Sequence, residues 1–191
     1  MGTRGAVGFR LDNKFYVTYN HYDSYPAGGL GDEVVKFCMF VEGLNAWDKL
    51  AENVRKLILV NEQSDIASPE DIHRYSKYCD VSVASQDAQN WYCLLRNAQN
   101  GAILWGVLED KIGHMIDSFD FLKDSLFCEY AYIINLDDMT LDFYKGFQKY
   151  PTQTNLPFEM VMDDGYYPVA LIEQFHFDNL PIEWKGEQED E

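Results

Sequence analysis

Two stretches of alternating apolar and polar residues, one near each end of the chain, constrain the fold most strongly. The first covers residues 7–11 and 15–19 around Asp12-Asn13, and the second covers residues 130–136 and 141–144 around Asp137-Asp138. Alternation with a period of two, broken by a short polar turn, is typical of a β-hairpin. We therefore expect a hairpin near each end, and a last strand over residues 169–177.

The chain between the two hairpins has apolar residues at helical spacing. Helices are expected over residues 31–42, 45–60, 68 onward and 85–100, and residues 102–121 favour helix over strand. Asn45, with Asp48 three residues later, is the expected N-cap of the second helix, and Ser68-Pro69 begins the third. The order predicts an α+β fold: an antiparallel sheet from the N-terminal and C-terminal hairpins, with a central block of helices packed on it.

Length and composition fit one soluble globular domain. A chain of 191 residues that is 47% hydrophobic can build a single sizeable core. We expect residues 1–184 to form it and residues 185–191 to be an acidic disordered tail. The four cysteines lie far apart with core-like neighbours, which indicates reduced thiols in a cytoplasmic protein. Neither a signal peptide nor a membrane span is predicted.

The net charge of −17 lies mostly in the second half of the chain. Residues 1–95 carry 9 basic and 13 acidic side chains, whereas residues 96–191 carry 6 and 19. Such a field repels nucleic-acid phosphates, so direct nucleic-acid binding is not expected. Two interpretations stay open: the charge serves solubility, or the acidic half is an inhibitory surface that occupies a basic, DNA-binding surface of a partner protein.

Polar chemistry is concentrated in the turn-rich segment from Tyr19 to Gly31, which reads YNHYDSYPAGGLG. If the second strand extends this far, the side chains of Tyr19, His21 and Asp23 share one face, and Arg4 on the neighbouring strand lies near them. A histidine oriented by a carboxylate suits acid-base chemistry, and an arginine can hold a phosphate or carboxylate. We expect a small polar or anionic ligand at Arg4, Tyr19, Asn20, His21, Asp23, Ser24, Gly28 and Gly29, with glycine amides cradling the anion.

A purely structural interpretation of this segment competes with ligand binding. In it, Asn20, Asp23 and Ser24 bond to the backbone to fix the turn, and Arg4 pairs with Asp23. If the protein is an enzyme, His21 and Asp23 are the first catalytic candidates. Metal binding would need ligands beyond these two side chains, so we predict neither a metal nor a cofactor.

Two further groups of residues carry possible chemistry. His114, Asp117 and Asp120 recur at every third position and would share one helix face, either as an acid-base or metal constellation or as a solvated surface. Asp124, Ser125, Cys128 and Glu129 would lie beside the first hairpin if the two hairpins pair. Cys128 is then either a nucleophile assisted by His21 or a buried structural cysteine.

Several sequence blocks resemble an uncharacterised family whose members occur in bacteria, phages and some fungi. The blocks are residues 1–5 (MGTRG), 19–26 (YNHYDSYP), 91–96 (WYCLLR), 115–118 (MIDS), 120–121 (DF), 124–132 (DSLFCEYAY) and 135–137 (NLD). They occur in order over most of residues 1–147. The family pattern after the proline is similar to P-x-G-L-G, and here Pro26 is followed by one extra residue. The resemblance implies an accessory role in phage and host biology, and the host cytoplasm as location, but no activity.

A second, fold-level likeness is to the N-terminal nucleophile hydrolases, which also begin with a strand and return late with a hairpin. It implies an amidohydrolase. These enzymes use the amine and the side chain of their first mature residue. Removal of Met1 would expose Gly2, which has no nucleophile, so Thr3 could serve only after a further cleavage.

Overall fold

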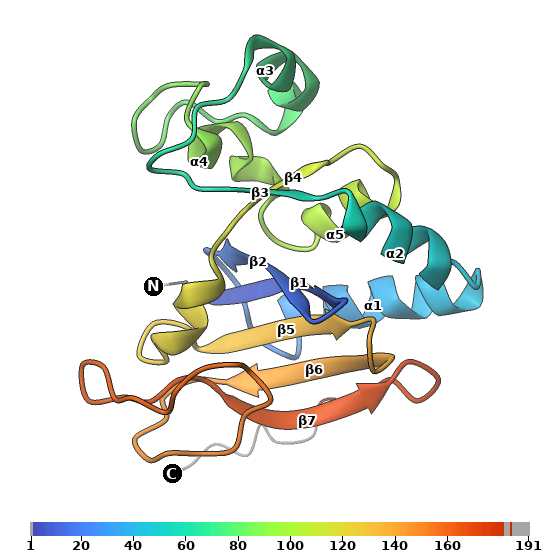
Figure 1. Ribbon diagram of the computed structural model, residues 1–191, viewed down its shortest axis with the longest axis vertical. Helices are drawn as coiled ribbons and strands as arrows, with labels where there is room; N and C mark the ends of the chain where they lie inside the picture. Colours follow the sequence, from blue (N-terminus) through green and yellow to red (C-terminus); the bar gives the residue numbers. More distant parts are fainter. Residues whose placement is uncertain (1, 182–183, 185–191) are drawn as a thin grey trace.

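A five-stranded sheet forms the base of the molecule. The computed structural model describes residues 2–181 and residue 184, so the predicted tail at 185–191 lies outside the described residues. The strands are β1 (Gly5–Leu11), β2 (Lys14–Asn20), β5 (Tyr130–Asn135), β6 (Thr140–Lys145) and β7 (Ala170–His176), in the order β2-β1-β5-β6-β7 (Figure 1). All neighbours are antiparallel except β1 and β5, which run parallel and join the two hairpins.

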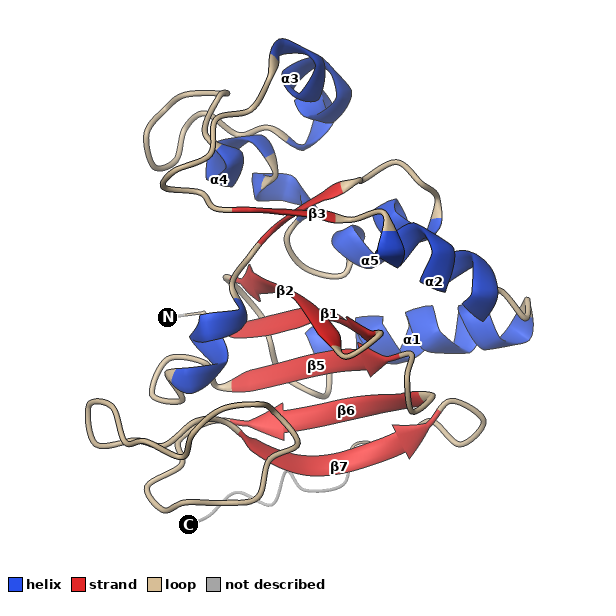
Figure 2. Cartoon of the chain, viewed as in Figure 1, coloured by secondary structure: helices blue, strands red, loops and turns tan. Residues whose placement is uncertain are grey.

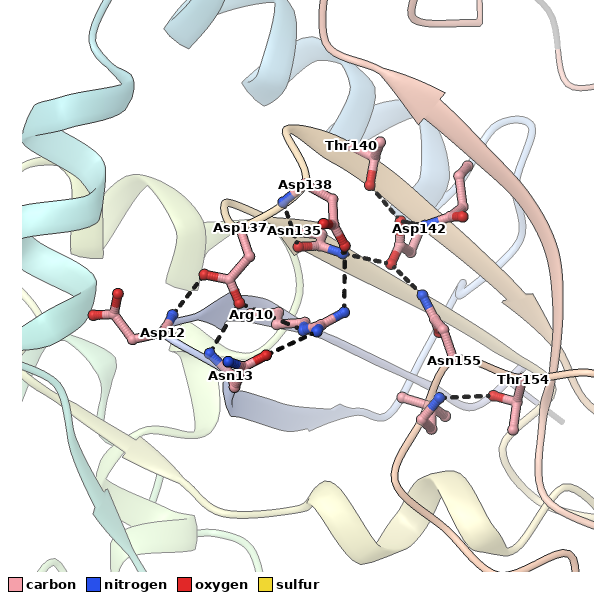
Figure 3. A network of polar contacts seen from close by, with 12 residues as sticks. Arg10, Asp12, Asn13, Asn135, Asp137, Asp138, Thr140, Asp142, Thr154 and Asn155 are labelled. Carbon is pink, nitrogen blue, oxygen red and sulfur yellow. Dashed lines mark hydrogen bonds and ion pairs between the residues drawn. The ribbon is translucent and has the colours of Figure 1, made fainter.

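The turn of the first hairpin is held by the turn of the second. Asp12 and Asn13 both have positive φ angles, 53° and 58°, as a type I′ turn requires. Their amides donate to the two carboxylate oxygens of Asp137, at 2.6 and 2.9 Å. The polar turn residues therefore set the hairpin's geometry and also fix its place beside β5 (Figure 3).

The rest of the chain forms a helical block. Its elements are α1 (Leu30–Gly43), α2 (Trp47–Arg55), β3 (Ile58–Val60), α3 (Pro69–Tyr75), α4 (Trp91–Leu94), α5 (Ala102–Leu108), β4 (His114–Ile116) and three 3-10 helices, η1 (Ser76–Tyr78), η2 (Arg96–Ala98) and η3 (Phe119–Lys123). β3 and β4 pair in parallel as a separate two-stranded sheet. In Figure 2, α1 lies beside the main sheet, and α2, α3, α4, α5, β3 and β4 lie beyond its β2 edge. η3 packs on the sheet itself.

Alternating strand residues divide the core between the two faces of the sheet. Val7 and Phe9 of β1 belong to the larger cluster with the apolar face of α1, whereas Ala6 belongs to a smaller cluster that includes Leu122 of η3. The period-two pattern thus has apolar partners on both sides. The predicted α+β fold, with both hairpins in one sheet and helices packed on it, is confirmed.

The starts of two helices were predicted correctly from residues that are neighbours in the sequence. α1 lies close to its expected bounds. Asp32 and Glu33 are in its first turn, where their negative charges interact favourably with the positive end of the helix dipole. α3 begins as expected, with Ser68 as its N-cap and Pro69 in its first turn, and Ser68 and Asp71 also form a capping box. Both signals depend only on neighbours in the sequence.

The second helix is shorter than expected. It ends at Arg55, and the predicted helical residues Ile58–Val60 instead pair with β4 as a strand. Asn45 has a φ of 50° and does not cap the helix, which starts without a side-chain cap after Ala46. Pairing with a distant strand therefore overrides the local helical spacing.

Two other helical predictions were also too long. Only residues 91–94 and 96–98 are helical in the 85–100 stretch, where Asn90 caps α4. α5 ends at Leu108, and the chain turns back so that the Ile112 amide donates to the Gly106 carbonyl at 3.0 Å. A Cβ at Gly106 would lie 2.3 Å from Ile112, so glycine permits this close return.

Candidate functional site

The open end of the first hairpin presents a hydrogen-bonded pair of polar rings. β2 ends at Asn20, and the Tyr19 hydroxyl lies 2.8 Å from Nδ1 of His21. The two rings also meet edge to face. The two side chains lie together, but the strand does not extend as far as the expectation required, so no strand face runs from Tyr19 through Asp23.

Two guanidinium groups flank this pair. Arg4 immediately precedes β1, and Arg96 begins η2. Arg96 donates to the Tyr22 hydroxyl at 3.1 Å and to Oε1 of Gln99 at 2.5 Å, and it lies over the rings of both Tyr22 and Tyr92. We call Arg4, Tyr19, His21, Tyr22, Tyr92 and Arg96 the Tyr19–His21 site.

Burial and the two arginines set the protonation of the pair. Burial, and then the positive charges of Arg96 and Arg4, lower the pKa of His21 below its ordinary value of 6.5. Burial raises the pKa of Tyr19, although Arg4 and Arg96 oppose this shift. At neutral pH the imidazole is therefore neutral and the phenol keeps its proton.

Arg4 and Arg96 differ from the other arginines in their partners. Of the five arginines in the chain, Arg10 and Arg55 form ion pairs with aspartates. Arg74 donates to two main-chain carbonyls. Within the described residues, no ion pair joins the guanidinium of Arg4 or Arg96 to a carboxylate. This is notable in a chain with 32 acidic and 15 basic side chains.

Three cavities meet at the Tyr19–His21 site. One of about 610 Å³ includes His21, Tyr22 and Arg96, and one of about 510 Å³ includes Arg4, Tyr19 and Tyr92. The third, of about 480 Å³, includes both Arg4 and His21. Arg4 and His21 thus each border two of the three cavities.

Most carboxylates around these cavities already have partners. Glu33 accepts from the Gly101 amide, Asp80 from Ser82, and Glu129 from the Arg4 amide. Asp120 pairs with Lys123 at 2.6 Å. Glu62, whose pKa is raised by burial, and Asp23 have no such bond in the described residues. The bonded carboxylates keep their charge. Hydrogen bonds from Ser82 and, to a lesser extent, the charge of Arg96 lower the pKa of Asp80. None of these carboxylates forms an ion pair with either guanidinium in the described structure.

The glycine turn does not form the expected anion cradle. The Gly28 amide donates to Asp32 at 2.8 Å and the Gly31 amide donates to the Tyr25 carbonyl at 3.1 Å, so neither is free for a ligand. A Cβ at Gly29 would lie 2.3 Å from the Asp23 carbonyl oxygen. The glycines instead allow the loop to pack against itself.

The other predicted residues of the loop have mixed roles. Asn20 and Ser24 are buried, and the Asn20 amide group donates to the Tyr22 main-chain carbonyl at 2.5 Å, as the structural interpretation expects, and also to Ser24 Oγ at 2.7 Å. Asp23 borders the 610 Å³ cavity, but its φ of 49° takes the chain away from the strand path. In the described structure Asp23 pairs with neither His21 nor Arg4, so the predicted Arg4–Asp23 pair is wrong.

The remaining candidates lie apart from one another or are buried. His114 is on β4, where its Nδ1 lies 2.8 Å from the Tyr75 hydroxyl, and the expected helix face shared with Asp117 and Asp120 does not exist. Cys128 is fully buried, and burial strongly raises the pKa of its thiol, which makes it a poor nucleophile. Thr3 is also buried, at 3% exposure.

Asp124, Ser125 and Glu129 do lie close to the first hairpin, as expected if the two hairpins pair. Asp124 borders the same 510 Å³ cavity as Arg4, and the Glu129 amide donates to the Arg4 carbonyl at 3.1 Å. Ser125 is buried and accepts a hydrogen bond from the Gln148 amide. Their contacts are structural, because each bonds to backbone of the chain.

Sequence reasoning missed Arg96 and Tyr92. Both belong to the block at residues 91–96 that carried the family resemblance, which was the one available signal. Asn90 positions them, because its side chain accepts from the Tyr92 and Cys93 amides and starts α4.

Neither a metal-binding group of side chains nor a similarity to a known protein indicates a function for the described residues. No group of three or more His, Cys, Asp or Glu side chains in the described residues could hold a metal ion. None of the described helices combines the length and the apolar character needed to cross a bilayer. Comparisons with protein-family models, curated proteins and solved structures find no match. The family resemblance of the sequence blocks therefore stays a prediction.

Proposed function

We propose that this protein binds a small molecule through an anionic group, such as a phosphate or carboxylate, at the Tyr19–His21 site. The observation that carries the proposal is that Arg4 and Arg96 flank the Tyr19–His21 pair and, among the described residues, have no carboxylate partner. Guanidinium groups without a counter-charge attract anions, and arginine can bind a phosphate or carboxylate by two parallel hydrogen bonds.

His21 adds a polar group that can respond to an anion. Its Nδ1 is engaged by Tyr19, and Nε2 has no partner in the described part of the chain. If the Tyr19 hydroxyl donates to Nδ1, Nε2 carries the proton and can donate to the ligand. An anion at Nε2 would also favour the imidazolium form, so binding would take up a proton.

The space at the site suits a small ligand. The three cavities that border Arg4, His21 or both measure about 510, 480 and 610 Å³, within the range of about 300–1,000 Å³ that is usual for small-molecule sites. The wall carboxylates are mostly bonded to neighbouring groups. An anion can therefore approach without displacing an ion pair.

Calorimetric titration with inorganic phosphate tests this proposal. We expect Arg4→Ala and Arg96→Ala each to weaken binding by about 10- to 100-fold, because each removes hydrogen bonds to a charged group worth about 1.5–3 kcal/mol. Arg55→Ala is the matched control, because Arg55 is exposed and pairs with Asp12 instead. Equal phosphate affinity in all four proteins would contradict the proposal. If the site variants simply unfold, the two arginines are structural.

A further inference from the structure

The 480 Å³ cavity beside Arg4 and His21 has an aromatic rim. Tyr25, Phe127 and Phe147 border it, and their side chains are 44%, 44% and 48% exposed. They come from three separate segments, the loop after β2, the loop before β5 and the loop after β6. Three half-exposed rings around one cavity form a surface that a flat apolar group could cover.

The ring of Phe147 is held at the cavity by a backbone conformation that is energetically unfavourable. Phe147 has a φ of 57°, which is uncommon for a bulky residue. The conformation is kept by hydrogen bonds from the Phe147 amide to the Ser125 carbonyl, at 2.7 Å, and from the Gln148 amide to Ser125 Oγ, at 3.1 Å. Ser125 is itself fully buried. The chain thus fixes Phe147 beside the cavity rather than in the core.

Arg4 links the aromatic rim to the anion site. Its guanidinium carbon lies 5.4 Å from the centre of the Phe127 ring, within cation–π range. His21 borders the same cavity. A ligand held by Arg4 and His21 would therefore have Phe127 within reach of the group attached to its anion.

We infer that the anion bound at the Tyr19–His21 site carries a planar aromatic or heteroaromatic ring, which lies against Phe127, Phe147 and Tyr25. This inference rests on the proposed function and narrows the ligand to a class, the aryl or heteroaryl phosphates and carboxylates. The positive charge of Arg4 at the edge of an aromatic surface complements a ring that bears a negative group. A neutral apolar occupant would leave Arg4 without a counter-charge.

Three probes test the inference, at a pH above the second ionisation of each so that all are dianions: inorganic phosphate, phenyl phosphate and cyclohexyl phosphate. We expect phenyl phosphate to bind the wild-type protein about 3- to 10-fold more tightly than either of the others, because stacked aromatic groups add modest affinity beyond the area they bury. Phe127→Leu and Phe147→Leu should reduce this advantage and leave the affinity for inorganic phosphate unchanged. Phe40→Leu is the control, since Phe40 is 45% exposed on α1 and away from the cavity.

The outcomes separate the two proposals. If phosphate binds and phenyl phosphate binds no more tightly, the ring inference is wrong and the anion site stands. The same conclusion follows if phenyl phosphate keeps its higher affinity in both leucine variants. If none of the three probes binds, both proposals fall. If phenyl phosphate alone binds and Phe127→Leu removes binding, the inference holds, and loss of that binding in Arg4→Ala shows that the anion contributes.

Discussion

The two ends of β1 carry one arginine each, and their surroundings differ. Arg10, near the hairpin turn, lies 3.5 Å from Asp137 and 3.4 Å from Asp138, and it donates to Asn13 (Figure 3). Arg4, at the open end, has no ion pair within the described residues and lies over the ring of Phe127. The same residue type thus forms ion pairs at one end of β1 and has none, within the described residues, just before its other end.

The turn end extends into a buried network of hydrogen bonds around Asp142. Asp142 on β6 is 0% exposed, and its carboxylate accepts from Thr140, Gln174, Asn135 and Asn155 at 2.6–3.0 Å. A buried carboxylate is tolerated when hydrogen-bond donors of the protein replace the water molecules that it loses on burial. The comparison teaches that the fold supplies carboxylates to Arg10 but, within the described residues, forms no ion pair with Arg4 or Arg96. We propose that a bound anion explains this difference.

The largest expected effect is on the stability of the fold, at the turn end of the sheet. Asp142→Ala would remove the shared acceptor of four side chains, two of which, Thr140 and Asn135, are buried. We expect it to lower the free energy of unfolding by about 2–4 kcal/mol. Urea denaturation measures this loss. Phosphate affinity, measured below the melting temperature, should stay unchanged. A loss under about 1 kcal/mol would show that water replaces the carboxylate and that the network is not what stabilises this end.

A reciprocal pair of substitutions tests the comparison itself. Arg10→Ala should lower the free energy of unfolding by about 1–3 kcal/mol, because it leaves Asp137 and Asp138 without their cation, and should leave phosphate affinity unchanged. Arg4→Ala should do the reverse, with a stability change within about 0.5 kcal/mol because Arg4 is exposed. Similar stability losses in both variants would remove the distinction between the two ends.

A smaller loss of stability is expected from a substitution in the glycine loop beside the site. Gly28 has a φ of 74° with open space around its Cα, so Gly28→Ala should cost about 1 kcal/mol from backbone strain alone. Because its amide already donates to Asp32, phosphate affinity should not change. A marked loss of affinity in the folded variant would restore the amide-cradle interpretation.

The smallest effect concerns pH. The pKa of His21 is lowered in the folded protein, so as pH falls through 6.5 the unfolded state takes up a proton first. The histidine therefore favours folding above pH 6.5 and loses that contribution below it. His114, whose pKa is also lowered by burial, acts in the same direction. The fall in melting temperature below this pH should be smaller in His21→Gln than in the wild type, and equal falls would contradict the assignment.

Ligand binding should show the opposite pH dependence. Sulfate keeps its charge over this range, and binding beside His21 favours the imidazolium form, so sulfate affinity should rise as pH falls below neutrality. His21→Gln should flatten this rise. Affinity that is independent of pH in the wild type would place the anion away from His21.

The predictable parts of this structure were set by neighbours in the sequence. Alternation gave both hairpins, Ser68 and Pro69 gave the start of α3, and the same alternation predicted that Tyr19 lies beside His21. The unpredicted parts depend on distant partners. Residues 58–60 form a strand because β4 pairs with them, and Arg96 reaches the site because it contacts Tyr22, 74 positions away in the loop after β2. No local pattern encodes these contacts.

The arginine side chains offer the most direct test of the central claim. The chain has only five, so their Nε–H groups can be resolved and assigned in a two-dimensional nitrogen–proton spectrum during a phosphate titration. We predict that the signals of Arg4 and Arg96 shift and saturate together, while those of Arg10, Arg55 and Arg74 stay in place. Absence of any shift at Arg4 and Arg96, or equal shifts at all five arginines, would contradict the proposal that this end of the sheet is a binding site.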